Sequence, residues 1–239
     1  MKLVLRISRY NPETDSRPHD QDFSIDMEPT DRILDALIRI KDLQDGSLSF
    51  RKSCAHGVCG SDAMIINGKE RLACKTLVRD VATEENAVVT LQPLSYMPVQ
   101  RDLMVDQRDF FAKYRAVSPF LINEEKAPEK ERIQSVEQRA GFDDATACIL
   151  CGSCYSSCPV LRDNPRFIGP AALVQAARFL LDSRDKGFAQ RMQALDAPDG
   201  AWACENHFNC TRVCPREIKV TKNINAIKRM ITKSREGSA

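Results

Sequence analysis

The stretch CILCGSCYSSCP at residues 148–159 decides the interpretation of this 239-residue chain. Its four cysteines are spaced C-x2-C-x2-C-x3-C, and a proline follows the last of them. The whole chain holds ten cysteines. Disulfides are rare in reducing compartments, where spaced cysteines more often bind metal. The spacing of the cysteines must therefore indicate which kind of metal site they form.

The spacing at residues 148–159 is typical of bacterial ferredoxins, in which the fourth cysteine of the run ligates the other of two iron–sulfur clusters. A second run, CENHFNCTRVCP, lies at residues 204–215 and has His207 at the place of the second cysteine. Two runs that exchange their last cysteines predict two clusters. The first is a [4Fe–4S] cluster on Cys148, Cys151, Cys154 and Cys214, and the second is a [3Fe–4S] cluster on Cys158, Cys204 and Cys210.

The number of thiolates favours this assignment of cluster types. Ten cysteines and Asp62 are eleven candidate ligands, which divide into groups of four, four and three. A site with three thiolates can hold a cubane that lacks one iron, and thiolates are the soft donors that such clusters require. His207 leaves an alternative open. If it ligated a fourth iron, the last cluster would be [4Fe–4S]; otherwise it packs beside the cluster or faces a partner.

A third cysteine group lies near the N-terminus, where CAHGVCGSD occupies residues 54–62 and Cys74 follows. Plant-type [2Fe–2S] proteins show C-x4-C-x2-C and a distant fourth cysteine. Cys54 and Cys59 have the first of these spacings, and Asp62 stands where the third cysteine would be. Two glycines suit a loop that needs unusual backbone angles. The sequence therefore predicts a [2Fe–2S] cluster on Cys54, Cys59, Asp62 and Cys74.

Two alternatives remain at this N-terminal group. Zinc also accepts cysteine and aspartate, although structural zinc sites more often use pairs of short C-x2–4-C knuckles. A zinc site is colourless, whereas an iron–sulfur protein is brown, so colour separates the two. In the second alternative, Asp62 does not bind iron. It is then a surface carboxylate or a carboxylate that forms a hydrogen bond near the cluster.

The hydrophobic pattern predicts an α+β fold with two domains, at residues 1–105 and 106–239. In the first, apolar and polar residues alternate along residues 2–8, which indicates a strand. Asn67-Gly68 indicates a hairpin, and Thr30 is expected to cap a helix. Beyond residue 105 helical patterns dominate.

Composition restricts the function little. The formal net charge is +2, and no nucleic-acid partner is expected. No apolar run approaches the roughly 20 residues of a membrane span. The first residues lack the apolar core of a signal peptide, so export is not expected. No nucleophile–base pair or phosphate-binding glycine loop is evident, and electron transfer is the activity that the cysteine groups favour.

A plant-type ferredoxin domain followed by a bacterial-type one resembles the iron–sulfur subunit of succinate:quinone oxidoreductase (complex II), the family of succinate dehydrogenase and fumarate reductase. The resemblance covers nearly the whole chain. The motifs that carry it are RKSC at 51–54, CGSD at 59–62, LAC at 72–74, RDLMVD at 101–106, the run at 148–159, FIGP at 167–170 and CP at 214–215.

The resemblance implies a β-grasp N-terminal domain and an all-α C-terminal domain. It implies docking between a flavoprotein subunit with covalent FAD and a membrane anchor. Electrons would pass from the flavin through the [2Fe–2S], [4Fe–4S] and [3Fe–4S] clusters to quinone, and Pro159 and His207 are the candidate quinone-proximal residues. The expected location is peripheral, on the cytoplasmic face of a bacterial or archaeal inner membrane.

Some residues near the last cluster depart from the family pattern. Val160-Leu161-Arg162-Asp163 replace residues that are often aromatic, and His207 stands where an apolar residue is usual. Three other functions remain to be separated from succinate oxidation. They are fumarate reduction by the same architecture, a freestanding soluble ferredoxin, and a zinc-stabilised binding module. A heterodisulfide-reductase-type subunit shares cysteine-rich runs, but the N-terminal group with Asp62 argues against it.

Overall fold

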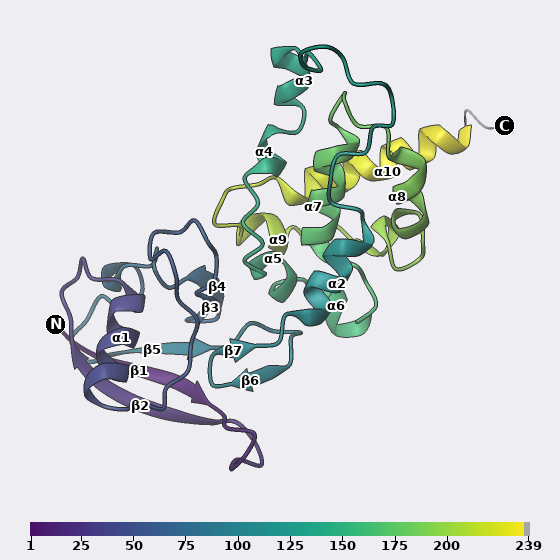
Figure 1. Cartoon of the computed structure of the whole chain (residues 1–239). Coiled ribbons are helices and arrows are strands. Elements are labelled where there is room, and N and C mark those ends of the chain that lie inside the picture. The colour runs from purple at the N-terminus through teal and green to yellow at the C-terminus, as the bar shows by residue number, and fades with distance from the viewer. Residues whose placement is uncertain (237–239) are drawn as a thin grey trace. The chain divides into compact units, whose positions relative to one another are not determined.

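The computed structural model describes residues 1–236, and Figure 1 shows how its helices and strands follow one another. The chain forms two compact units. The first contains Met1–Gln107 and Ile149–Ser157, and the second contains Arg108–Cys148 and Cys158–Ala239. Most of the first cysteine-rich run thus belongs to the unit that the N-terminal residues form.

The first unit is built on a five-stranded sheet in the order β2-β1-β5-β3-β4. The central strands β1 and β5 are parallel, and the other neighbouring strands are antiparallel. The five strands are β1 (Lys2–Arg9), β2 (His19–Asp26), β3 (Ala63–Ile66), β4 (Lys69–Leu72) and β5 (Ala87–Gln92). The smaller elements are β6 (Val99–Arg101), β7 (Met104–Val105), the 3-10 helix η1 (Val78–Asp80) and α5 (Ser153–Ser156).

The predicted alternation along the first strand is confirmed. Leu3, Leu5 and Ile7 are fully buried, while the residues between them are at least partly exposed. Burying such a side chain stabilises the fold by roughly 1.5–3 kcal/mol. The predicted hairpin is confirmed as well, because Asn67 and Gly68, both at positive φ, join β3 to β4. Strand register therefore follows from local sequence here.

The helix of the first unit, α1 (Ile33–Leu43), lies against the sheet (Figure 1). The prediction that Thr30 caps it is wrong, since the N-cap is Arg32. The N–H groups of Ile33 and Leu34 instead donate to the carbonyls of Thr76 and Ala73, at 3.0 and 3.1 Å. A helix needs acceptors for its first N–H groups, and here they come from a distant segment, which no local pattern reveals.

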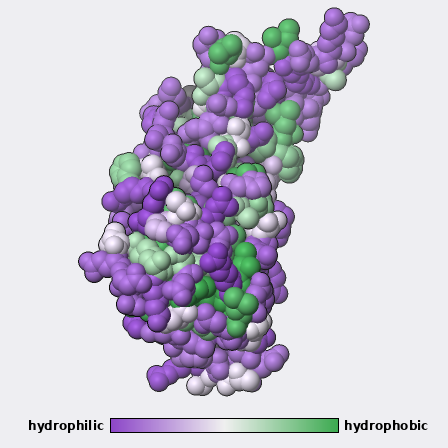
Figure 2. Space-filling view, turned by 90° about the vertical axis from the view of Figure 1, so that its left-hand side faces the viewer, coloured by the Kyte–Doolittle hydropathy of each residue, from purple (hydrophilic) through white to green (hydrophobic). Residues whose placement is uncertain are grey.

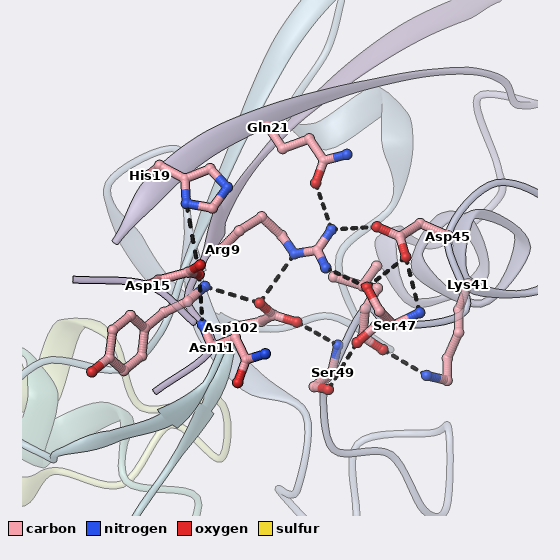
Figure 3. A network of polar contacts seen from close by, with 12 residues as sticks. Arg9, Asn11, Asp15, His19, Gln21, Lys41, Asp45, Ser47, Ser49 and Asp102 are labelled. Atoms are coloured by element: carbon pink, nitrogen blue, oxygen red, sulfur yellow. Dashed lines mark hydrogen bonds and ion pairs between the residues drawn. The ribbon is translucent and has the colours of Figure 1, made fainter. Parts of the chain in front are cut away.

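The buried side chain of Arg9 joins several segments of the first unit (Figure 3). Its Nε donates to Asp102 at 3.0 Å, and its terminal nitrogens donate to Asp45, Gln21 and Ser47 at 2.6–2.8 Å. This arginine, Arg9, ends β1. Its contacts therefore fix the end of the central strand to β2, to the segment after α1 and to the turn between β6 and β7.

The described residues of the second unit contain helices and no strand. Its longer helices are α2 (Arg108–Ala116), α7 (Gly169–Leu180), α8 (Phe188–Leu195) and α10 (Val220–Glu236). The short ones are α3 (Val136–Ala140), α4 (Asp143–Thr146), α6 (Val160–Asp163), α9 (Asn209–Arg212) and the 3-10 helix η2 (Ala201–Ala203). Nearly every residue of α7 is buried, and α10 packs against it. With a sheet in one unit and helices in the other, the chain is α+β.

The surface is largely hydrophilic, as the face in Figure 2 shows, with hydrophobic side chains in separate patches. Along residues 1–236 no helix has both the length and the apolar character needed to cross a membrane.

Candidate iron–sulfur sites

Cys54, Cys59 and Asp62 of the N-terminal cysteine group lie on a loop between α1 and β3, and Cys74 follows β4. Gly57 and Gly60 have φ of +78° and +70°, and both lie close to neighbouring atoms. A Cβ on Gly57 would fall 2.7 Å from the side chain of Lys75, and one on Gly60 would fall 2.6 Å from the Cβ of Cys151. Both positions thus require glycine for its backbone freedom and for its lack of a side chain.

The loop directs backbone donors at the first cysteine sulfur. The N–H groups of Val58 and Cys59 donate to Cys54 Sγ at 3.4 and 3.3 Å. Backbone hydrogen bonds from His56, Cys59 and Val58 together lower the pKa of the Cys54 thiol to about 6. The loop therefore favours the charged thiolate, which is the form that binds iron, and hydrogen bonds to sulfur are a main determinant of cluster potential.

Asp62 and Cys74 form the buried side of this site. Asp62 is 3% exposed, and its Oδ2 accepts the N–H of Cys74 at 2.6 Å. Burial, followed by the hydrogen bond with Asp62 and the charge of Asp62, raises the pKa of the Cys74 thiol to about 12. A thiol so placed needs a cation nearby to become a thiolate.

The other oxygen of Asp62, Oδ1, is buried and has no hydrogen-bond partner. Leaving a buried acceptor unsatisfied costs roughly 1–3 kcal/mol, and more for a charged group. A metal ion next to this oxygen would remove that cost. The buried Asp62 oxygen, the Cys74 thiol and the donors to Cys54 together fit a metal cluster at this loop.

The alternative of a single zinc ion finds no direct support in the geometry. Within the described residues, no three His, Cys, Asp or Glu side chains converge on one point as ligands of a single ion would. An iron–sulfur cluster does not require this, because its ligands bind different iron atoms. All ten cysteines lie in the described part of the chain, and none of them forms a disulfide there.

Three cysteines of the second unit line one small cavity. They are Cys158, Cys204 and Cys210, the three that the sequence assigns to one cluster. Burial first, and then the charges of Cys210 and Cys204, raise the pKa of the Cys158 thiol to about 11. The three cysteines line the same cavity, so their arrangement suits a group that is shared between them.

Pro159 and His207 line the same cavity. Pro159 is the N-cap of the short helix α6. The His207 ring is 46% exposed, and its Nε2 lies 3.0 Å from a carboxylate oxygen of Glu205. The structure therefore places both residues beside the three cysteines, and it pairs His207 with a carboxylate.

The four cysteines assigned to the [4Fe–4S] cluster are divided between the units. Cys151 and Cys154 belong to the first unit, and Cys148 and Cys214 belong to the second. Cys151 lies 3.4 Å from the hydroxyl of Ser153. That these four cysteines ligate one [4Fe–4S] cluster stays a prediction.

Sequence reasoning missed the hydroxyl groups at these sites. Ser61 Oγ lies 3.1 Å from Cys59 Sγ, and Thr221 Oγ1 lies 3.6 Å from Cys210 Sγ. Ser61 stands inside the motif and was open to prediction. Thr221 carried no local signal, because it reaches Cys210 only through the packing of α10 against α9.

Comparison with known proteins agrees with these sites. Residues 4–112 match the family described as a 2Fe–2S iron–sulfur cluster binding domain, and residues 144–218 match the 4Fe–4S dicluster domain. The predicted order of a [2Fe–2S] ferredoxin domain before a dicluster domain is thus confirmed. Binding domains for [2Fe–2S] and [4Fe–4S] clusters are both present.

Whole-length relatives carry related names. The chain is 42% identical to the succinate dehydrogenase iron-sulfur subunit of Coxiella burnetii over 95% of each chain. It is 39% identical to the fumarate reductase iron-sulfur subunit of Mycobacterium tuberculosis over 96% of each. A chain of the Mycobacterium smegmatis Sdh1 complex in the apo form superposes with a TM-score of 0.86 at 28% identity, covering 98% of this chain and 96% of that one.

Proposed function

The chain belongs to the family of iron–sulfur subunits of succinate dehydrogenase and fumarate reductase, and from this premise we propose that it serves succinate oxidation. It is an iron–sulfur electron-transfer subunit of an oxidoreductase complex. The observation that supports succinate oxidation is the 42% identity to a succinate dehydrogenase subunit over 95% of both chains.

Three ligand sets are proposed. A [2Fe–2S] cluster would be held by Cys54, Cys59, Asp62 and Cys74. A [4Fe–4S] cluster would be held by Cys148, Cys151, Cys154 and Cys214. A [3Fe–4S] cluster would be held by Cys158, Cys204 and Cys210. When bound, the three clusters supply one-electron carriers between the FAD of a flavoprotein and quinone.

The residues of the chain prepare each site in a different way. At the first, the N–H groups of Val58 and Cys59 stabilise charge on Cys54, while Asp62 presents a buried oxygen without a partner. At the third, Cys158 and Cys210 are themselves buried, which limits the access of water to their sulfurs. A dry site strengthens every hydrogen bond and charge within it.

The partners proposed are a flavoprotein subunit, one or more integral membrane anchor subunits, and quinone near Pro159 and His207. The location proposed is peripheral, on the cytoplasmic face of a bacterial or archaeal inner membrane. We also propose a domain boundary at residue 105, with a β-grasp domain before it and an all-α domain after it. The mixed sheet with α1 packed on it supports the first of these descriptions.

Electron paramagnetic resonance on the purified complex tests the cluster assignment. The air-oxidised sample should show a [3Fe–4S] signal, and stepwise reduction should add [2Fe–2S] and then [4Fe–4S] signals. Two [4Fe–4S] centres without the oxidised signal would make His207 a ligand instead of a neighbour. A complex without iron signals, or one without a flavoprotein, would contradict the proposal.

Fumarate reduction is the second candidate, because a relative of that name is 39% identical over 96% of both chains. The direction of electron flow depends on the reduction potentials of the clusters and the quinone, so the rates of succinate oxidation and fumarate reduction distinguish the two functions. The purified complex should oxidise succinate with a quinone acceptor faster than it reduces fumarate with a quinol donor. The opposite ratio would favour fumarate reductase.

A further inference from the structure

We propose that the hydroxyl groups of Thr211 and Thr221 form a directed hydrogen-bond relay that raises the reduction potential of the cluster held by Cys158, Cys204 and Cys210. The inference rests on the proposed function, which places a cluster at these cysteines. It assigns a role in setting the potential to two residues that ligate nothing.

The relay starts from the geometry around Cys210. Thr221 Oγ1 lies 3.6 Å from Cys210 Sγ and 3.1 Å from Thr211 Oγ1. The backbone N–H of Thr221 donates to Thr211 Oγ1 at 3.0 Å. Thr221 and Cys210 are 2% and 7% exposed, so water competes little for these bonds. The contacts join α9, which contains Cys210, to the first turn of α10.

The direction of each bond follows from the protons available. A cysteine sulfur bound to iron is a thiolate, which only accepts hydrogen bonds. The hydroxyl of Thr221 must therefore donate to Cys210 Sγ. Its oxygen can then accept from the Thr211 hydroxyl, whose own oxygen accepts the N–H of Thr221. The three bonds thus point the same way, from backbone N–H through two hydroxyls to sulfur.

A chain of bonds with one direction polarises each member, so the last donor is stronger than an isolated hydroxyl. Uptake of one electron at the site adds one negative charge, which the ligand sulfurs share. A donor aimed at Cys210 stabilises this charge more than it stabilises the oxidised state. The reduced state is favoured, and the reduction potential rises.

The other two sulfurs of the cavity have different surroundings. Cys158 receives backbone donors from Val160 and Leu161. Cys204 Sγ lies 3.7 Å from the side-chain oxygen of Asn206. Cys210 also receives the backbone N–H of Thr211, but of the three it is the cysteine that threonine hydroxyls approach, and mutation removes these groups without changing the backbone. The relay can therefore be tested by side-chain substitution.

The test is a redox titration of the intact complex, followed through the oxidised [3Fe–4S] signal. Thr221→Val keeps the shape and removes the hydroxyl. We expect its ratio of reduced to oxidised cluster to fall about tenfold at a fixed ambient potential, which is about 59 mV for one electron. Thr221→Ser keeps the donor and should behave as the unmodified protein does. The potentials of the other two clusters should stay unchanged.

Thr232 is the matched control, since it lies on the same helix, is exposed, and its hydroxyl donates to the carbonyl of Lys228 within that helix. Thr232→Val should leave all three potentials unchanged. An unshifted titration in Thr221→Val would overturn the proposal, as would a Thr221→Ser shift as large as that of Thr221→Val, because packing would then explain both.

If Thr221→Val fails to assemble the cluster, a second variant tests the proposal. Thr211→Val leaves the Thr221 hydroxyl beside Cys210 and removes the donor behind it, together with the weaker contact of the Thr211 side chain with Cys210, so a smaller fall of the potential is expected. An unchanged potential in Thr211→Val would refute the relay. Absence of the [3Fe–4S] signal from the unmodified complex is a different result, which would contradict the proposed ligand set of Cys158, Cys204 and Cys210 and this inference with it.

Discussion

Replacing Asp102 with asparagine should destabilise the protein by about 3 kcal/mol. Asp102 is 2% exposed, and its carboxylate accepts three hydrogen bonds. Oδ1 accepts from Arg9 Nε at 3.0 Å and from the N–H of Tyr10 at 2.9 Å, and Oδ2 accepts from the N–H of Ser49 at 2.8 Å. Asparagine tolerates the φ of +45° at this turn better than most residues. The substitution therefore tests the charge and its bonds, with little backbone strain.

The magnitude follows from the bonds that change. Asparagine has one acceptor oxygen and one donor nitrogen, so either the Ser49 N–H or the donors on the other side lose their acceptor. If the oxygen stays on the Arg9 side, the bond from Arg9 is weakened by roughly 1 kcal/mol because its acceptor loses the charge, and the unsatisfied buried N–H of Ser49 costs roughly 1–3 kcal/mol. Arg9 keeps Asp45 as a charged partner, which holds the total near 3 kcal/mol rather than at the upper end of the range for a broken buried ion pair.

Thermal unfolding of the holo-protein, followed by circular dichroism, measures this change. For a chain of this size each kcal/mol lowers the midpoint by about 2–4 °C, so a fall of roughly 6–12 °C is expected. The matched control is Asp22→Asn, which breaks the exposed pair with Arg6, a residue of the same strand β1 as Arg9. Exposed pairs contribute about 0–1 kcal/mol. If both variants shifted the midpoint equally, the reasoning about burial would be refuted.

Three further changes have defined outcomes. The hydrogen bond from Arg9, and then that from Ser47, lower the pKa of Asp45 from 3.8 to about 2, so its stabilisation is present above pH 4 and is lost as the pH falls towards 2. Asp45→Asn should thus reduce the difference in the free energy of unfolding between pH 5 and pH 3, by about 1 kcal/mol after allowance for solvent screening, and an unaltered difference would count against this. Gly60→Ala places a Cβ 2.6 Å from Cys151 and should lower the iron content per chain, whereas Gly68→Ala, at a similar φ of +72° but with nothing within 4 Å, should retain its iron; equal losses would mean that backbone strain alone is responsible. Asp62→Cys should keep a [2Fe–2S] spectrum and move its potential, because thiolate is a softer ligand than carboxylate, and an unchanged potential would argue that Asp62 does not bind iron.

Local spacing in the sequence was enough for the features that depend on neighbours along the chain. The alternation along β1 and the Asn67-Gly68 turn predicted the strand and the hairpin, because side-chain period and turn geometry are local properties. Cysteine spacing predicted the cluster groups for a similar reason. A loop that wraps a cluster must present its thiolates at short, fixed intervals, so the intervals remain visible in the sequence.

Tertiary structure decided the features that depend on contacts between distant residues. The acceptors that begin α1 come from Ala73 and Thr76, and the oxygen of Asp62 that lacks a hydrogen-bond partner is buried in the folded chain. Thr221 contacts Cys210 because α10 packs against α9. These arrangements follow from which surfaces the hydrophobic core brings together. Since burial turns a weak polar contact into a strong one, the residues that tune the sites became evident in the folded chain and not in the spacing of its residues.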